Sequence, residues 1–257
     1  MTLFDLSGKV AIVTGSTKGI GEAIAHRFAE HGAKVVVSSR KAEMCDKVAG
    51  EINEKWGKGE EVAYPVPCNI GVKEELQNLV DRTNDKWGMV TTLVCNAAVN
   101  PFFGSTLDIP DDAFERIMKS NIQSNHWLCN MVLPQMIERR DGSITIISSI
   151  GGHHGNTVIG AYCISKAADM QLARNLAAEF GEHNIRANAI APGLIKTYFA
   201  KALWSDPEIL ENSTSGSALK RIGAPDEIAG AAVFLASAAG AFVTGQTINV
   251  DGGVTAL

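Results

Sequence analysis

The sequence predicts an α/β fold: a doubly wound parallel sheet of about seven strands, with helices on both faces, in a single domain. Short segments rich in Val and Ile alternate with helical patterns, which is typical of right-handed parallel crossovers. A glycine-rich segment directly follows the first strand. The chain has 257 residues, which suits one α/β core, and no linker or internal repeat divides it. We therefore expect one domain over residues 1–257.

The first strand, Val10–Val13, ends in the glycine-rich turn Thr14–Gly21, which opens into a helical segment, Glu22–His31. Glycines let the backbone approach a pyrophosphate, and the start of a helix offers unpaired N–H groups to it. Such a motif alone can be a plain tight turn, but the strand before it and the helix after it favour a Rossmann-type dinucleotide site. The expected cofactor contacts are Gly15, Ser16, Lys18, Gly19, Ile20 and Gly21.

The end of the second strand, Lys34–Ser38, indicates which nicotinamide cofactor binds. An acid about 20 residues past the glycine turn would favour NAD, but this chain has Ser39 and Arg40 at that place. Arg40 can pair with a 2′-phosphate, the serine can donate to it, and Lys18 points toward the same region. We therefore predict NADP(H). The alternative is that Arg40 and Lys41 are only the solvated start of the next helix.

The remaining strands are expected at Glu61–Pro65, Thr92–Cys95, Ser143–Ser148, Arg186–Ile190 and Thr247–Val250. Polar or glycine-containing motifs follow four of the five, namely Asn69, Asn96, Ser149 and Pro192-Gly193. In an open parallel sheet, ligands bind beyond the carboxyl ends of the strands, where the winding reverses. We expect these loops to converge on one crevice.

The longest apolar stretch, Ile228–Val243, is shorter than the roughly 20 residues that span a bilayer. We expect a buried helix there, with Pro225, Asp226 and Glu227 in its first turn. The N-terminus lacks the charged and apolar regions of a signal peptide. No membrane partner is therefore expected.

Composition narrows the partners and the compartment. The formal net charge is −5 and the basic residues are scattered, which argues against a nucleic-acid surface. The cysteines are odd in number and lack metal-ligand spacing, so we expect reduced thiols in a cytoplasmic compartment and no metal. They are Cys45, Cys68, Cys95, Cys129 and Cys163.

Four polar residues form a candidate catalytic set. Tyr162 and Lys166 lie one helical turn apart, so both project from the same helix face. Ser149 lies thirteen residues before Tyr162 at the end of a strand, an interval that selects it over Ser148. Asn121 lies upstream in a helix-like segment. The alternatives are a tyrosine ring packed on the core, a lysine extended along the surface, and an asparagine that only packs helices.

These four residues, the glycine turn and the Asn96-Ala97-Ala98 turn together resemble the short-chain dehydrogenase/reductase family along nearly the whole chain. The resemblance implies that Tyr162 is the general acid of carbonyl reduction and that Lys166 holds the nicotinamide ribose. Ser149 would orient the substrate oxygen, and Asn121 would anchor a water that relays protons to the lysine. We expect Lys166 and the oxidised nicotinamide to lower the pKa of Tyr162 from about 10.

The same resemblance implies further cofactor contacts. It places Asn69 and Ile70 at the adenine, although many relatives have Asp at the first position. Ala98 replaces a glycine at the end of the fourth strand, which should leave the backbone path open. The segment Pro192–Thr197 resembles a nicotinamide-carboxamide turn, although a bare Pro-Gly turn is the alternative. The implied contacts are Asn69, Ile70, Asn96, Ala97, Ala98, Pro192, Gly193, Ile195 and Thr197, besides Tyr162 and Lys166.

Residues 194–216 are expected to form a mobile lid over the substrate. The candidate pocket residues are His153, Phe199 and Trp204. The lid aromatics suggest an apolar ligand, and they could equally form an oligomer contact. His153, next to His154, could instead be solvated.

Three segments, Val37–Lys41, Asn96–Ser105 and Ala191–Thr197, resemble the subfamily of NADPH-dependent carbonyl and retinal reductases known as dehydrogenase/reductase member 4. This resemblance implies that ketones, α-dicarbonyls or retinoids are reduced by NADPH in a homotetramer, or a dimer. Animal members end in a peroxisomal tripeptide. This chain ends in Thr255-Ala256-Leu257 without the basic middle residue, so no peroxisomal address is expected.

The leading hypothesis is therefore an NADPH-dependent carbonyl reductase acting on a small-molecule carbonyl. One alternative is NAD(P)-dependent oxidation of a secondary alcohol, because the same residues serve both directions. A second alternative is a non-catalytic NADP-binding sensor. That alternative predicts a damaged catalytic set, whereas all four residues are present.

Overall fold

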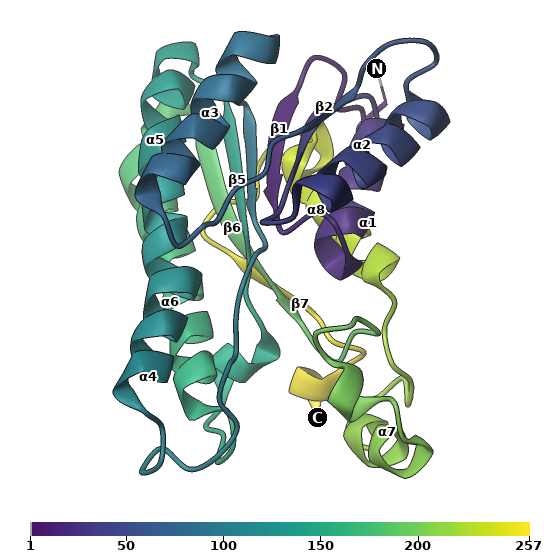
Figure 1. The fold of residues 1–257 in the computed structure, drawn as a ribbon, viewed down its shortest axis with the longest axis vertical. Coiled ribbons are helices and arrows are strands. Elements are labelled where there is room, and N and C mark those ends of the chain that lie inside the picture. Colours follow the sequence, from purple (N-terminus) through teal and green to yellow (C-terminus); the bar gives the residue numbers. More distant parts are fainter. Residues whose placement is uncertain (1) are drawn as a thin grey trace.

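The computed structural model describes residues 2–257. Within them lies one seven-stranded sheet in the order β3-β2-β1-β4-β5-β6-β7, and all neighbouring strands are parallel (Figure 1). The predicted doubly wound parallel sheet is confirmed. The strands are β1 Val10–Thr14, β2 Lys34–Ser38, β3 Ala63–Pro65, β4 Thr92–Cys95, β5 Gly142–Ile147, β6 Ile185–Pro192 and β7 Thr247–Val250.

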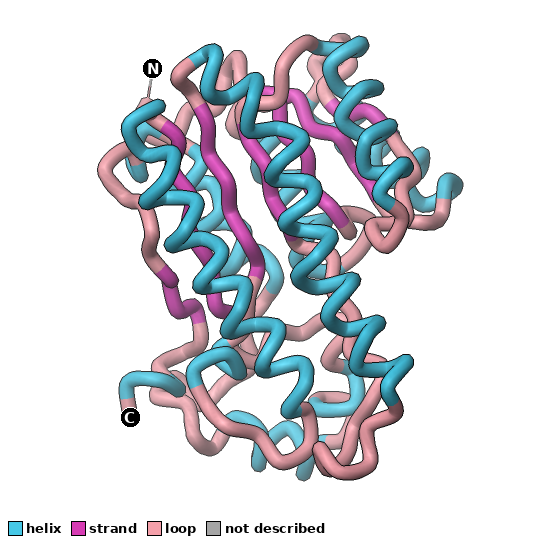
Figure 2. The backbone as a smooth tube through the Cα atoms, turned by 90° about the vertical axis from the view of Figure 1, so that its left-hand side faces the viewer, coloured by secondary structure: helices cyan, strands magenta, loops and turns pink. Residues whose placement is uncertain are grey.

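Two apolar cores cover the two faces of the sheet, because successive side chains of a strand point in opposite directions. In β1, Ala11 and Val13 belong to one core and Ile12 to the other. Helices α1, α2 and α8 cover the first core and α3, α5 and α6 the second (Figures 1 and 2). Their bounds are α1 Gly19–Glu30, α2 Ala42–Trp56, α3 Lys73–Trp87, α5 Ser124–Arg139, α6 Gly160–Phe180 and α8 Pro225–Ala236.

Several element boundaries differ from the sequence prediction. Helix α1 begins at Gly19 instead of Glu22, so it includes the last glycines of the turn. The apolar stretch expected to be helical up to Val243 ends as a helix at Ala236, since Ser237 is extended at φ −94° and ψ 177°. The chain then folds back tightly, because a Cβ on Gly240 would lie 2.5 Å from the carbonyl oxygen of Phe234. Strand β3 is shorter than expected at its start, and β6 is longer at both ends.

The winding of the sheet places the predicted motifs at one edge. Strand β1 pairs with β2 on one side and with β4 on the other, so the order reverses between β1 and β4. The glycine turn follows β1, and Asn96 follows β4. The short helix α7, Pro207–Thr214, and the C-terminus lie beyond the lower end of the sheet in Figure 1. The predicted motifs therefore gather at the reversal point, where ligands of such sheets bind.

Two chain-wide features concern the helices and the cysteines. In the described residues 2–257, no helix combines the length and apolar character that a membrane crossing needs. All five cysteines are buried free thiols.

Candidate active site

The glycine turn after β1 needs its glycines for two different reasons. Gly15 and Gly19 have φ of +64° and +63°, a region that L-residues rarely adopt. Gly21 has no space for a side chain, because a Cβ there would lie 2.4 Å from Nδ2 of Asn96 and 2.5 Å from the carbonyl oxygen of Gly15. A larger residue at any of the three positions would therefore deform the turn.

Asn96 and Thr14 lock this turn to the end of β4. Asn96 Nδ2 donates to the carbonyl oxygens of Thr14, at 2.8 Å, and Gly15, at 3.2 Å. The hydroxyl of Thr14 accepts from the backbone N–H groups of Asn96 and Ala97, at 3.0 and 3.1 Å. Asn96 thus shapes the cofactor cradle through the backbone, and Thr14 is a contributor that the sequence analysis did not name.

Ser16, another residue of the turn, is buried and bonded within the fold. Its hydroxyl donates to the carbonyl oxygen of Val13 at 2.7 Å and accepts from the N–H of Ser38 at 2.8 Å. These bonds hold the start of the turn against the end of β2.

The start of α1 fits a phosphate group. Its N-cap residue, Lys18, is extended, and its side chain makes no capping hydrogen bond to the first helical N–H groups. Uncapped N–H groups at the positive end of a helix bind anions readily. Thr197 lies directly over this turn, since a Cβ on Gly19 would lie 3.1 Å from its Cγ2. The predicted phosphate and nicotinamide segments therefore converge.

The predicted 2′-phosphate and adenine residues are accessible. Arg40 is exposed next to the start of α2, and Ser39 is half-buried with its hydroxyl 3.4 Å from Sγ of Cys45. Asn69 is exposed, and its N–H donates to the Glu75 carboxylate at 2.7 Å. Lys18 takes another direction: its Nζ lies 5.0 Å from the ring centroid of Tyr198, in the lid segment.

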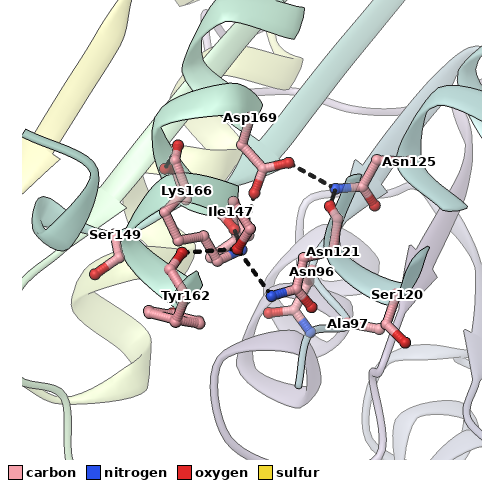
Figure 3. Close-up of polar contacts among 12 residues, drawn as sticks. Asn96, Ala97, Ser120, Asn121, Asn125, Ile147, Ser149, Tyr162, Lys166 and Asp169 are labelled. Carbon is pink, nitrogen blue, oxygen red and sulfur yellow. Dashed lines mark hydrogen bonds and ion pairs between the residues drawn. The ribbon is translucent and has the colours of Figure 1, made fainter. Parts of the chain in front are cut away.

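Tyr162 and Lys166 come from the first turns of α6, and Ser149 follows β5 (Figure 3). The Lys166 Nζ lies 5.6 Å from the centroid of the Tyr162 ring. The hydroxyl of Ser148 donates to the carbonyl oxygen of Lys166 at 2.7 Å and is buried. Ser149 is half-buried and its Oγ accepts from Gly151 N–H at 3.1 Å. Ser149 therefore remains available to a ligand, while Ser148 is occupied by the fold.

Lys166 is anchored by two acceptors. Its Nζ donates to the carbonyl oxygen of Ile147 at 2.8 Å and to Oδ2 of Asp169 at 2.9 Å. The Lys166 and Asp169 side chains are 3% and 0% exposed. Asp169 was not predicted from the sequence, although an acid three residues after Lys166, among apolar residues of the same helix, was a visible signal.

Asn121 lies in a π-helical turn, Lys119–Gln123, between α4, Asp111–Met118, and α5. Its Oδ1 accepts from the N–H of Val99 at 2.8 Å, and its Nδ2 donates to the carbonyl oxygen of Val99 and to Oγ of Ser165, both at 3.0 Å. The side chain thus joins the segment after β4 to α6. Its backbone oxygen accepts from Nδ2 of Asn125 at 2.6 Å.

The pKa of Tyr162 shifts in the direction opposite to the expectation for the cofactor-bound site. Burial raises this pKa above its ordinary value, while Lys166 and a hydrogen bond with Ser149 pull it down and Asp169 pushes it up. The expectation overlooked burial and Asp169. For Lys166, burial opposes the charged form, but Asp169 and Tyr162 raise the pKa of the ammonium above its ordinary value.

A β-bridge joins the two ends of the segment that contains the predicted lid. Ile195 forms a bridge with Gly223, and the segment between them contains α7. The Phe199 ring centroid lies 6.1 Å from that of Tyr162, so Phe199 is placed beside the candidate acid. Trp204 instead folds back on the lid, because its Nε1 donates to the carbonyl oxygen of Thr197 at 2.8 Å.

Two hollows lie in this region. A small one, lined mostly by apolar side chains such as Phe102 and Phe114, adjoins Tyr162. A larger cavity of about 380 Å³ lies between the lid and residues 249–254, and Tyr162 does not line it. His153 is exposed, with Nε2 2.9 Å from Oδ1 of Asn249.

Within the part of the chain that the structure describes, one cluster of metal-ligating residue types lies outside this site. Glu22 and His26 of α1 and Glu51 of α2 bring their ligand atoms within 4.8 Å of one another. Nδ1 of His26 is 3.4 Å from Nε1 of Trp56, which can only donate. A neutral His26 then carries its proton on Nε2, which leaves no free lone pair on the ring for a cation. With His26 in this tautomer, the cluster is a polar contact between two helices.

The chain matches known proteins over nearly its whole length. A family model described as enoyl-(acyl carrier protein) reductase matches residues 15–255. Dehydrogenase/reductase SDR family member 4 from Bos taurus is 43% identical, over 96% of this chain and 88% of the relative. The Homo sapiens protein of the same name is 40% identical over the same shares.

Solved structures agree with this fold. A gluconate 5-dehydrogenase from Burkholderia cenocepacia J2315, in complex with NADP and tartrate, has a TM-score of 0.93, with 30% identity over 99% of this chain and 98% of the other. A 7α-hydroxysteroid dehydrogenase complexed with NADH and 7-oxo glycochenodeoxycholic acid has a TM-score of 0.92, with 38% identity over 98% of this chain and 96% of the other. The two neighbours thus carry different nicotinamide cofactors.

Proposed function

The chain belongs to the short-chain dehydrogenase/reductase family, and from that premise we propose that it reduces a ketone or aldehyde to an alcohol with NADPH. The observation that carries the proposal is the joint placement of Ser149, Tyr162 and Lys166 at the carboxyl end of β5. This edge of the sheet also bears the glycine turn and Thr197. An acid, an ammonium and a hydroxyl donor are the groups that carbonyl reduction needs.

Each side chain has a distinct task in this proposal. NADPH, when bound, supplies the hydride to the carbonyl carbon. Tyr162 donates its phenolic proton to the carbonyl oxygen, and burial, which raises the pKa of this phenol, favours the protonated form. Ser149 donates a hydrogen bond to the same oxygen, and Lys166 stabilises the phenolate that remains. Asn121 holds the segment after β4 against α6 and so keeps these groups in register.

The general-acid role is tested with Tyr162→Phe, using Tyr64→Phe, a change at a half-buried tyrosine of β3, as the matched control. A panel of ketones, α-dicarbonyls and retinal is offered with NADPH, and NADPH consumption is measured. We expect kcat to fall about 100- to 10,000-fold in Tyr162→Phe, with NADPH binding and the control unchanged. Equal turnover by Tyr162→Phe would indicate that the consumption does not come from this site.

We propose NADP(H) as the cofactor because Arg40 is exposed where a 2′-phosphate would lie and Ser39 adjoins it. A charge-assisted hydrogen bond contributes about 1.5–3 kcal/mol. Arg40→Ala should therefore weaken NADPH binding about 10- to 100-fold and leave NADH binding nearly unchanged, measured by tryptophan quenching. The control is Lys47→Ala, which removes a positive charge from the same region of the surface. Equal weakening of both cofactors, or of neither, would contradict the phosphate contact.

Oxidation of a secondary alcohol is the second candidate, because two structural neighbours are named for dehydrogenases of hydroxyl substrates. Its test is turnover of secondary alcohols with NADP⁺ and NAD⁺.

The intact set of four catalytic residues argues against a non-catalytic NADP-binding sensor. We also propose a cytoplasmic compartment for these free thiols, a homotetramer, and an apolar contact between substrate and Phe199, with His153 and Trp204 at the edge of that pocket.

A further inference from the structure

The buried ion pair of Lys166 and Asp169 is not explained by the four predicted catalytic residues. Asp169 lies one turn along α6 from Lys166, and both of its carboxylate oxygens have partners. Oδ2 accepts from Lys166 Nζ and Oδ1 accepts from Nδ2 of Asn125, each at 2.9 Å (Figure 3). The same Nδ2 donates to the backbone oxygen of Asn121. The carboxylate is therefore fixed from both α5 and α6.

Lys166 and Asp169 are the charged groups that act on Tyr162. The other titratable groups that act on Tyr162, Lys166 and Asp169 are the thiols of Cys95 on β4 and Cys163 on α6. Cys129 and burial raise the pKa of Cys95, and burial raises the pKa of Cys163, so both stay neutral. The formal charges in this set are thus those of Lys166 and Asp169, which oppose each other.

We propose that Asp169 is a positioning residue that neutralises much of the Lys166 charge and so keeps Tyr162 protonated and ready to donate. This inference rests on the proposed function of the site. An unopposed ammonium 5.6 Å from the ring would favour the phenolate. The carboxylate 2.9 Å from that ammonium offsets this pull. It also fixes the direction of Nζ, which uses two of its three donors on Ile147 and Asp169 and keeps one for a ligand.

The decisive variant is Asp169→Asn, which removes the negative charge but keeps the size and an acceptor for Nζ. Reduction needs the phenol, so its rate falls as pH rises through the Tyr162 pKa. Oxidation needs the phenolate, so its rate rises through the same value. In Asp169→Asn we expect the fall of the reduction rate and the rise of the oxidation rate, the two pH transitions, to move to lower pH by roughly one unit or more. The control Asp46→Asn, an exposed change on α2, should leave both in place.

A purely structural Asp169 would change kcat or stability without moving either transition, and that result would overturn the proposal. Movement of both transitions to higher pH would also overturn it, because Lys166 would then have lost its proton. The double variant Asn125→Asp with Asp169→Asn returns one negative charge to the adjacent position. It should move the transitions most of the way back.

A measurement without turnover separates this proposal from the proposed function. The ultraviolet signal of phenolate formation is followed with rising pH, and Tyr162→Phe identifies the contribution of Tyr162. In Asp169→Asn the Tyr162 transition should occur at lower pH than in the wild type, and an unchanged or higher transition would refute the inference even if no carbonyl substrate is found. Asp169→Ser, which leaves room for a water, replaces Asp169→Asn if the latter does not fold.

Discussion

At the residue scale, Tyr162 is subject to opposing influences. Burial raises the pKa of its phenol, while Lys166 and Ser149 lower it. In the chain alone burial dominates, so the pKa of the phenol lies above its ordinary value and the phenol keeps its proton. A protonated phenol can donate a proton to the oxygen of a carbonyl that is being reduced, and it cannot act as the base of alcohol oxidation.

The pH dependence follows from this sign. Because reduction uses the protonated form, a raised pKa extends the active range upward, and the rate with NADPH should stay level through neutral pH and fall only in the alkaline range. The rate of alcohol oxidation should instead rise with pH. Initial rates in both directions, measured across the pH range on one substrate pair, check this. A reduction rate that already falls between mildly acidic and neutral pH would contradict the raised pKa.

Residue spacing predicted some of the contacts seen in the structure and missed others. One helical turn between Tyr162 and Lys166 places them together because the helix period is fixed. Asp169 escaped notice because an acid in an amphipathic helix usually faces water, and its burial depends on Asn125 from another helix. The bonds of Asn121 to Val99 and Ser165 likewise join segments whose proximity only the fold determines.

At the element scale, the turn between β1 and α1 depends on Gly21. A Cβ there would overlap Asn96 and the backbone of Gly15, so Gly21→Ala should lower the free energy of unfolding by about 1–3 kcal/mol. It should also weaken NADPH binding, because the turn that receives the phosphates must shift.

The matched control is Gly50→Ala in the middle of α2. No atom lies within 4 Å of the Cβ position there, and alanine favours the helix by about 0.5–1 kcal/mol. Denaturant unfolding and NADPH titration of both variants test the comparison. Equal stability and equal binding in Gly21→Ala would show that the turn can rearrange without cost.

Strand and helix order could be predicted because β-branched segments and amphipathic segments alternate clearly along the chain. The ends of the helices and strands were harder to predict from the sequence. The end of α8 at Ala236 depends on Gly240 packing against the helix end, a contact that apolar composition does not show. The rings of Phe199 and Trp204 were expected in one pocket, but Trp204 bonds to its own lid segment.

At the scale of the whole molecule, large apolar side chains remain exposed on α4, α6 and the segment before β7. Phe114, Ile164 and Phe242 are examples, and Phe242 is fully exposed. We propose that these side chains lie in contacts between subunits. We expect a mass in solution four times that of one chain, measured by light scattering after gel filtration. A monomer at micromolar concentration would contradict the proposed homotetramer.

The central claim, transfer of hydride from NADPH to a carbonyl with Tyr162 as the acid, is tested most directly by isotope transfer. NADPH deuterated at the transferring carbon of the nicotinamide is incubated with the carbonyl panel, and the alcohol products are analysed by mass spectrometry. The wild type should place one deuterium on the former carbonyl carbon of at least one substrate, and Tyr162→Phe should form that product at least about 100 times more slowly. Unlabelled product from the wild type, or equal labelling rates in the two proteins, would contradict the account.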